Sequence, residues 1–288
     1  MFRFPYDPGQ IDVPACARSG QSFRWREIAP GIWEGWDGAT FWRVATADAH
    51  VESNQPEDAF HAYFQADVRW EDRERELLAL DPGLADIAFQ ARMVRILRPS
   101  CATEVFFSFL CSANNHVPRI TSLVAKLAAR CPNGFPSAAQ IAEISERELR
   151  SEGFGYRGAT LPRAAAPLAE RGGEAYLQSL KHQPYEAIVE QLREMPGVGR
   201  KLADCIALFG LHREEAVPVD VHIWRQLCAR YCPEWKGAPL TDLRYRKATD
   251  AFRERFGNLS GWAQQWLFVA SLRGQQPPLS SKERGGKG

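Results

Sequence analysis

The sequence predicts an α+β fold, in which an N-terminal antiparallel β-sheet domain (residues 1–82) precedes two mostly α-helical subdomains (residues 83–272). Two patterns support this prediction. Between residues 19 and 54, short runs rich in aromatic residues, Thr and Val are separated by turn signals, as in antiparallel sheets. Farther along the chain, apolar residues recur at spacings of three and four, which is typical of amphipathic helices.

The expected strands lie in the runs SGQSFRWREI, GIWEGW and TFWRVAT. Asp37-Gly38 stands between the second and third runs, where a tight hairpin needs a residue that tolerates positive φ. Most of the aromatic side chains of this region are expected to form the core of the sheet domain.

Helical periodicity begins with a segment that opens at Thr103, and Pro118 suits the first turn of the next helix. Residues 185–195 place five apolar side chains on one stripe. We expect two further helices over 221–231 and 259–272.

Composition sets broad limits on function. The 288 residues are 45% apolar and 25% charged, as in ordinary soluble globular proteins, and the net charge of +1 does not itself indicate a nucleic-acid partner. The N-terminus lacks a signal-peptide core, and no apolar run is long enough to span a bilayer. We therefore expect a protein that is not secreted and has no membrane partner, cytoplasmic or nucleoid-associated in a bacterium and nuclear in a eukaryote. The Pro/Gly/Ser-rich tail at 273–288 is expected to be disordered.

The seven cysteines are odd in number and scattered, which favours free thiols. Cys228 and Cys232 are one helical turn apart, but no second cysteine pair is near them in the sequence. Buried thiols are therefore a better interpretation than a metal or iron–sulfur site.

The segment EMPGVGRKLADC at 194–205 predicts a helix–hairpin–helix over about 185–210. Gly197 and Gly199 permit a tight turn and leave backbone N–H groups uncovered at the start of the second helix, where the dipole also favours an anion. A nucleic-acid phosphate suits this geometry, although an ordinary helical corner would also need glycine.

Lys201 follows Arg200 in the first turn of the second helix, where the dipole disfavours a cation. A lysine there either reaches a phosphate or acts as an amine nucleophile. Cys205 and Phe209 follow at four-residue intervals on the same face and would suit the floor of a pocket for a flat ligand, or simply the core.

A second polar motif, PVDVH, lies in a loop over residues 216–222. Asp220 follows an extended stretch and precedes an amphipathic segment, so it is a good helix N-cap. It could also be an ionised carboxylate that stabilises positive charge on a nearby sugar. His222 could donate to a phosphate, although a lone histidine is more often structural.

Taken together, these motifs resemble the helix–hairpin–helix DNA glycosylase superfamily, and in particular its 8-oxoguanine DNA glycosylases/AP lyases of the eukaryotic type. The resemblance covers most of the chain, and its matching segments occur in family order. They are SGQSFRWRE at 19–27, FSFLCSANNHVPRIT at 107–121, GFGYRGA at 153–159, MPGVGRKLADC at 195–205, AVPVDVHIWR at 216–225 and WAQQWLF at 262–268.

The resemblance implies a base-excision repair enzyme that flips 8-oxoguanine, opposite cytosine, out of duplex DNA. It makes Lys201 the nucleophile, which forms a Schiff base with the deoxyribose and allows the strand to be nicked by β-elimination, and it makes Asp220 the essential carboxylate. The carbonyl of Gly20 would accept a hydrogen bond from the N7–H that 8-oxoguanine has and guanine lacks. The other residues that it places around the flipped base are Cys205, Phe209, Gln264 and Phe268.

The resemblance also assigns contacts to the rest of the duplex. Asn114 would fill the space left by the flipped base, Tyr156 would wedge beside the estranged cytosine, and Arg119 and Arg157 would read it. Phosphate contacts are assigned to Gly197, Gly199, Arg200 and His222. The family admits a monovalent cation at hairpin carbonyls, here those of Arg193, Met195 and Val198.

The sequence departs from the family at three positions. Arg200 replaces a small polar residue, which we expect to strengthen phosphate binding. His116 stands where the family often has Asn and Phe209 where it has Met, which puts the rim of the pocket in doubt. The chain lacks the four-cysteine cluster motif of the endonuclease III and adenine-glycosylase branches, so we expect no iron–sulfur cluster. The reaction that the resemblance implies also needs no redox cofactor and no catalytic metal.

Two alternatives remain open from the residues. A monofunctional alkyl-purine DNA glycosylase shares the hairpin and the aspartate but acts through water, without a lysine. A non-catalytic helix–hairpin–helix DNA-binding protein would use the hairpin only as a phosphate clamp. The expected partner is double-stranded DNA containing oxidised guanine, bound by a monomer.

Overall fold

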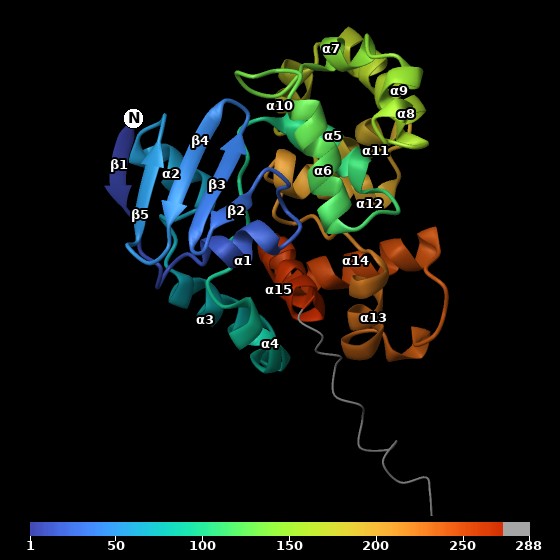
Figure 1. Cartoon of the computed structure of the whole chain (residues 1–288). Helices are drawn as coiled ribbons and strands as arrows, with labels where there is room; N and C mark the ends of the chain where they lie inside the picture. Colours follow the sequence, from blue (N-terminus) through green and yellow to red (C-terminus); the bar gives the residue numbers. More distant parts are fainter. Residues whose placement is uncertain (273–288) are drawn as a thin grey trace, which may run out of the picture.

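The computed structural model describes residues 1–272; the tail at 273–288, which we expect to be disordered, lies outside the described residues. A five-stranded antiparallel sheet lies on one side of the molecule and most of the helices on the other, as the α+β prediction requires (Figure 1). The strand order is β1-β5-β4-β3-β2. The strands are β1 Phe2–Pro5, β2 Arg26–Ala29, β3 Ile32–Asp37, β4 Thr40–Ala45 and β5 His50–Ser53.

The predicted hairpin is present, with Asp37 paired to Thr40 across the turn and Gly38 at φ +55°. Strand β2 covers only the end of the run expected to form the first strand. Residues 19–25 are instead irregular, because Gly20 has φ +73° and the Gln21 side chain donates to the Arg95 carbonyl and accepts from the Leu97 amide. The sequence pattern therefore overstated the length of this strand.

The helices before the hairpin are α1 Val13–Arg18, α2 Glu57–Phe64, α3 Trp70–Leu80, α4 Ala85–Ala91, α5 Ala102–Ser112, α6 Val117–Ala128, α7 Ala138–Ala142, α8 Glu146–Ser151, α9 Arg157–Glu170 and α10 Glu174–Leu180. The hairpin and the C-terminal part contain α11 Tyr185–Arg193, α12 Arg200–Cys205, α13 Val221–Arg230, α14 Asp242–Phe256 and α15 Ser260–Leu272. Pro118 lies in the first turn of α6, as expected. One short π-helical segment, η2 Ile206–Gly210, continues α12, and short 3₁₀ turns lie at Pro82–Leu84 (η1), Pro233–Trp235 (η3) and Gly257–Leu259 (η4).

Two buried clusters form the core. One fills the sheet domain and includes Trp25 and Trp42, whose rings stack with centroids 5.9 Å apart. The other runs through the helices and includes Trp70 of α3 and Trp266 of α15, which stack at 5.5 Å. Because Val269 of α15 packs into the sheet-domain cluster, α15 contributes to both cores.

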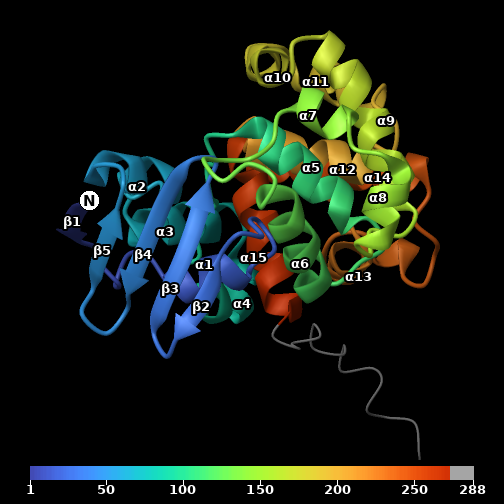
Figure 2. The ribbon, with the colours of Figure 1, turned by 45° about the horizontal axis from the view of Figure 1, so that its top comes forward.

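Helix α15 therefore connects the parts of the molecule. It packs against α4, α13 and α14, and both views place it between the sheet and the pair α13 and α14 (Figure 1, Figure 2). Its Gln265 side chain donates to the Ser19 carbonyl at 3.1 Å, so the C-terminal helix fixes the irregular segment around Gly20. No helix among residues 1–272 is long and apolar enough to cross a membrane.

Candidate active site

The hairpin between α11 and α12 is a tight turn in which the Val198 amide donates to the Met195 carbonyl at 3.0 Å. Pro196 and Gly197 take its central positions, and Gly197 has φ +85°, the pattern of a type II turn. Glycine is needed here for a second reason, because a Cβ at residue 197 would lie 2.4 Å from Cγ2 of Thr160. Gly199 is exposed, and no side chain caps the first turn of α12.

Lys201 lies in this first turn, half-buried, with its Nζ 5.8 Å from the ring centroid of Phe109 on α5. Phe109 in turn stacks on Phe209 at 5.5 Å and meets Phe23 edge-on at 5.7 Å. The amine is therefore next to an aromatic surface built from three separate segments of the chain. Phe109 was not singled out from the sequence, since its position on an apolar helical stripe gives no sign that it borders a site.

Cys205 is buried on the same helix, and burial raises the pKa of its thiol to about 11. The charge of Lys201 lowers this pKa and that of Asp220 raises it, so both groups are close enough to influence the thiol. The two residues predicted to carry the chemistry thus lie around the same buried sulfur atom.

Asp220 is the N-cap of α13, as expected. Its Oδ1 accepts from the backbone amides of His222 and Ile223, each at 2.9 Å, and such a cap contributes about 1 kcal/mol to helix stability. Within residues 1–272, Oδ2 takes no hydrogen bond. His222 is exposed in the first turn of α13.

Gly20, Gln264 and Phe268 are distant in sequence and close in the structure. A Cβ at residue 20 would lie 3.2 Å from Cε1 of the Phe268 ring, so the glycine backbone lies against that ring. Gln264 is buried, and its Nε2 donates to the Pro218 carbonyl at 3.2 Å, which ties α15 to the loop before Asp220. Its buried Oε1 has no hydrogen-bond partner within residues 1–272, an arrangement that costs about 1–3 kcal/mol unless a ligand supplies a donor.

The residues assigned to the opposite strand form a second group. The Tyr156 hydroxyl donates to the Ala113 carbonyl at 2.8 Å, and Nη2 of Arg157 donates to the same carbonyl and to that of Asn114. Asn114 is exposed and has φ +49°, a left-handed conformation in which Asn is among the better tolerated residues. Arg119 donates to the Gly153 carbonyl at 3.2 Å, so its segment joins the group.

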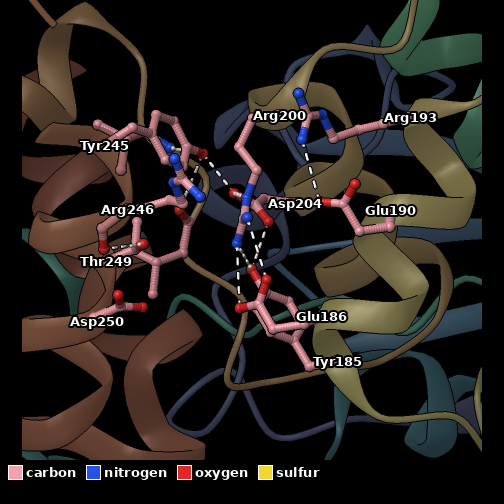
Figure 3. A network of polar contacts seen from close by, with 12 residues as sticks. Tyr185, Glu186, Glu190, Arg193, Arg200, Asp204, Tyr245, Arg246, Thr249 and Asp250 are labelled. Carbon is pink, nitrogen blue, oxygen red and sulfur yellow. Dashed lines mark hydrogen bonds and ion pairs between the residues drawn. The ribbon is translucent and has the colours of Figure 1, made fainter. Parts of the chain in front are cut away.

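The Arg200 side chain is held by acidic and aromatic side chains of the protein itself. It is only 11% exposed and turns away from the hairpin to the buried Asp204, at 3.4 Å, and to Glu186, at 3.3 Å (Figure 3). The guanidinium also lies over the rings of Tyr185 and Tyr245. With these partners the Arg200 side chain would have to leave them to contact a phosphate, and its expected contribution to phosphate affinity stays a prediction. Asp204, four residues on, is the partner that the helical spacing would have indicated.

Side chains of the types that ligate transition metals do not gather in the described part of the chain. Among residues 1–272 no group of three or more His, Cys, Asp or Glu side chains is placed to hold a metal ion. All seven cysteines are free thiols. At the hairpin, the Met195 carbonyl accepts from Val198 and closes the turn.

A family model described as "HhH-GPD superfamily base excision DNA repair protein" matches residues 107–254, which include Lys201 and Asp220. The chain belongs to the HhH-GPD superfamily of base excision DNA repair proteins. The match extends over about half of the chain. It leaves out Gly20, Gln264 and Phe268, so these three need support from whole-chain relatives.

Such relatives exist. The chain is 31% identical over 294 residues to the N-glycosylase/DNA lyase OGG1 of Arabidopsis thaliana, covering 94% of this chain and 80% of the relative. It also resembles the 8-oxoguanine glycosylase/lyase of Clostridium acetobutylicum, solved with double-stranded DNA containing cytosine opposite 8-oxoG, at 27% identity and a TM-score of 0.80 over 92% of this chain and 93% of that one. The 3-methyladenine DNA glycosylase of Archaeoglobus fulgidus shares the fold at 18% identity and a TM-score of 0.69, over 94% and 99%.

Proposed function

We propose that this protein is a bifunctional DNA glycosylase and AP lyase that excises 8-oxoguanine paired with cytosine. The contact between the Gly20 backbone and the Phe268 ring is the observation that supports this substrate most directly. These two residues lie 248 positions apart in the sequence, and the resemblance assigns both of them to the oxidised base. The relatives that match most of the chain are named for this activity, and one was solved with cytosine opposite 8-oxoG.

The pocket offers a chemical basis for selecting the lesion. The Gly20 carbonyl would accept the N7–H of 8-oxoguanine and repel the bare N7 acceptor of guanine. The unpaired Oε1 of Gln264 would take a donor from the Watson–Crick edge of the base. Flipping the nucleotide costs a few kcal/mol, which these contacts and ring stacking on Phe268 would offset.

The chemistry follows from Lys201 and Asp220. The lone pair of the Lys201 nitrogen forms a bond to C1′ as the bond from C1′ to the base breaks, and the base leaves with the proton that this nitrogen gives up. The ionised Asp220 stabilises the positive charge that develops on the sugar. Opening of the sugar ring gives an imine, which acidifies C2′; loss of a C2′ proton then expels the 3′ phosphate and nicks the strand.

Every group in this scheme comes from the protein or the DNA, so we propose a reaction that uses no redox cofactor, iron–sulfur cluster or catalytic metal. A monovalent cation at the carbonyls of Arg193, Met195 and Val198 would be structural. We further propose a monomer that works where the DNA is, in the cytoplasm or nucleoid of a bacterium or the nucleus of a eukaryote.

Borohydride trapping tests the proposal. The wild type should form a covalent complex with an 8-oxoguanine·cytosine duplex, and Lys201→Gln should abolish it. Lys247→Gln, which removes an exposed lysine of α14, is the matched control and should trap as the wild type does.

The outcomes separate the alternatives. Release of alkylated purines without an adduct would favour the monofunctional glycosylase. Binding to DNA with no base release from any duplex would favour the non-catalytic protein.

A further inference from the structure

Asp204 is a fully buried carboxylate on α12, three residues after Lys201. Its Oδ1 accepts from the Tyr185 hydroxyl and its Oδ2 from the Tyr245 hydroxyl, both at 2.5 Å (Figure 3). Burial raises the pKa of this carboxyl, and the Arg200 guanidinium and the two hydroxyls oppose that rise. A buried charge is tolerated only when it is paired and hydrogen-bonded, and Asp204 meets both conditions.

The two tyrosines bind the same carboxylate but connect it to different parts of the protein. Tyr185 opens α11, and its ring lies under the guanidinium of Arg253 at 4.8 Å. Tyr245 lies on α14, and its hydroxyl oxygen also accepts from the Val219 amide at 3.0 Å. Only Tyr245 therefore joins α12 to the residue immediately before Asp220.

We propose that Asp204 and Tyr245 are positioning residues for Asp220. Asp204 holds the Tyr245 hydroxyl on the helix that carries Lys201, and that hydroxyl holds the Val219 amide. The helix that carries Lys201 and the residue before Asp220 are consequently held by the same tyrosine hydroxyl. This inference rests on the proposed function and adds residues that touch neither DNA nor base.

Three features make this chain of contacts stiff. Hydrogen bonds to a carboxylate are about twice as strong as those between neutral groups. Asp204, Tyr245 and Val219 are all buried, so water does not compete for their bonds. On the other side of the loop, Gln264 holds the Pro218 carbonyl, so consecutive residues before Asp220 are fixed from α14 and from α15.

The test compares two substitutions that each remove one oxygen atom. Tyr245→Phe should lower the single-turnover rate of 8-oxoguanine excision at saturating enzyme by about 10–100-fold, since small displacements of a reacting group have effects of this size. Its Kd for the same duplex should stay within about twofold, because no DNA contact changes. Tyr185→Phe, which removes an equally short bond to the same carboxylate, should keep the excision rate within about threefold.

Amide exchange gives a second readout that does not depend on activity. In Tyr245→Phe the Val219 amide should exchange faster with solvent deuterium, and in Tyr185→Phe it should exchange as in the wild type. If Tyr245→Phe does not melt cooperatively, Asp204→Asn replaces it in both measurements, with the same expected results.

Equal excision rates for the two tyrosine variants, or an unchanged exchange rate at Val219 in Tyr245→Phe, would overturn the inference. A wild-type protein that releases no base would instead contradict the proposed function. The exchange rate at Val219 would then decide by itself whether Tyr245 holds the loop.

Discussion

The pocket assigned to the flipped base and the group assigned to the opposite strand are held in different ways. In the pocket, α15 contacts segments that are distant in the sequence: the Gln264 side chain donates to the Pro218 carbonyl, and the Phe268 ring lies against the backbone of Gly20. In the opposite-strand group, Tyr156 and Arg157 both donate to one backbone carbonyl, that of Ala113. These contacts arrange the proposed pocket in the free protein, whereas Nη2 of Arg157, the proposed reader, is engaged by backbone carbonyls.

The difference has an energetic meaning. A preorganised pocket needs no rearrangement at the moment of reaction, which favours catalysis. An arginine that is already hydrogen-bonded in the free protein exchanges one set of hydrogen bonds for another when it binds a base. The net gain in binding free energy is therefore small, and such a residue contributes to selectivity more than to affinity. Substitutions in the pocket should therefore have larger effects than substitutions in the opposite-strand group.

The largest effect is expected from Gly20→Ala. The new Cβ would lie 3.2 Å from the Phe268 ring at a position with φ +73°, so the backbone is strained and the ring must give by a few tenths of an ångström. We expect this to displace the carbonyl that is proposed to select the lesion. Excision of 8-oxoguanine should fall by about 100-fold in single-turnover assays. Gly237→Ala is the matched control, because it carries similar backbone strain at φ +79° with nothing within 4 Å of the added carbon. Equal losses in the two variants would mean that strain alone explains the effect.

A similarly large effect is expected for Cys205, whose thiol should react much more slowly with alkylating reagents than an ordinary cysteine. Burial raises the pKa of its thiol from 9.0 to about 11, which favours the neutral form, so deprotonation moves to higher pH. At pH 8 the thiolate fraction should be about 100-fold lower than that of an ordinary cysteine, and alkylation by iodoacetamide should be slower by at least this factor.

Mass spectrometry of the free protein measures this alkylation, with the partly exposed Cys131 as internal reference. Alkylation of Cys205 as fast as that of Cys131 would show that the pocket is open rather than preorganised.

A smaller effect is expected from Arg157→Ala. The ratio of excision opposite cytosine to excision opposite adenine should fall by about 10-fold, since one well-placed arginine contributes 1–3 kcal/mol of discrimination between bases. Arg163→Ala, an exposed arginine of the same helix, should leave the ratio unchanged. If Arg157→Ala discriminates as well as the wild type, its assignment as a reader is wrong.

The smallest effect is expected from Tyr156→Phe, which keeps the ring and removes only the bond to the Ala113 carbonyl. The substitution removes at most one modest hydrogen bond from the free protein and from its DNA complex. The Kd for the 8-oxoguanine·cytosine duplex should therefore change by about threefold or less. A fluorescence titration measures it. A loss larger than that of Arg157→Ala would show that this loop, too, must be preorganised.

The sequence was most informative where local chemistry decides the structure. The glycine-dependent turn at Gly197 and the N-cap at Asp220 depend on neighbouring residues, and both are present as predicted. The chain order of strands and helices was also predicted, although the first expected strand was too long. There, the bonds of Gln21 to residues 95 and 97 prevail over the local pattern.

Contacts between segments distant in the sequence could be identified only from the folded chain. Phe109 borders Lys201 because α5 packs against α12 and η2, and its apolar neighbours in the sequence give no sign of this position. The bond between Asp204 and Tyr245 joins residues 41 positions apart. The sequence places the Arg200 charge beside the hairpin, but only the folded chain shows that its side chain turns to Asp204 and Glu186.

The most direct test of the central claim is to locate the covalent bond to DNA. The wild type should be trapped with borohydride on an 8-oxoguanine·cytosine duplex, digested with a protease and mapped by mass spectrometry. We predict that the deoxyribose remnant is attached to Lys201, on the peptide that contains PGVGRKLADC. A remnant attached to another lysine, or to the N-terminal amine, would contradict the account.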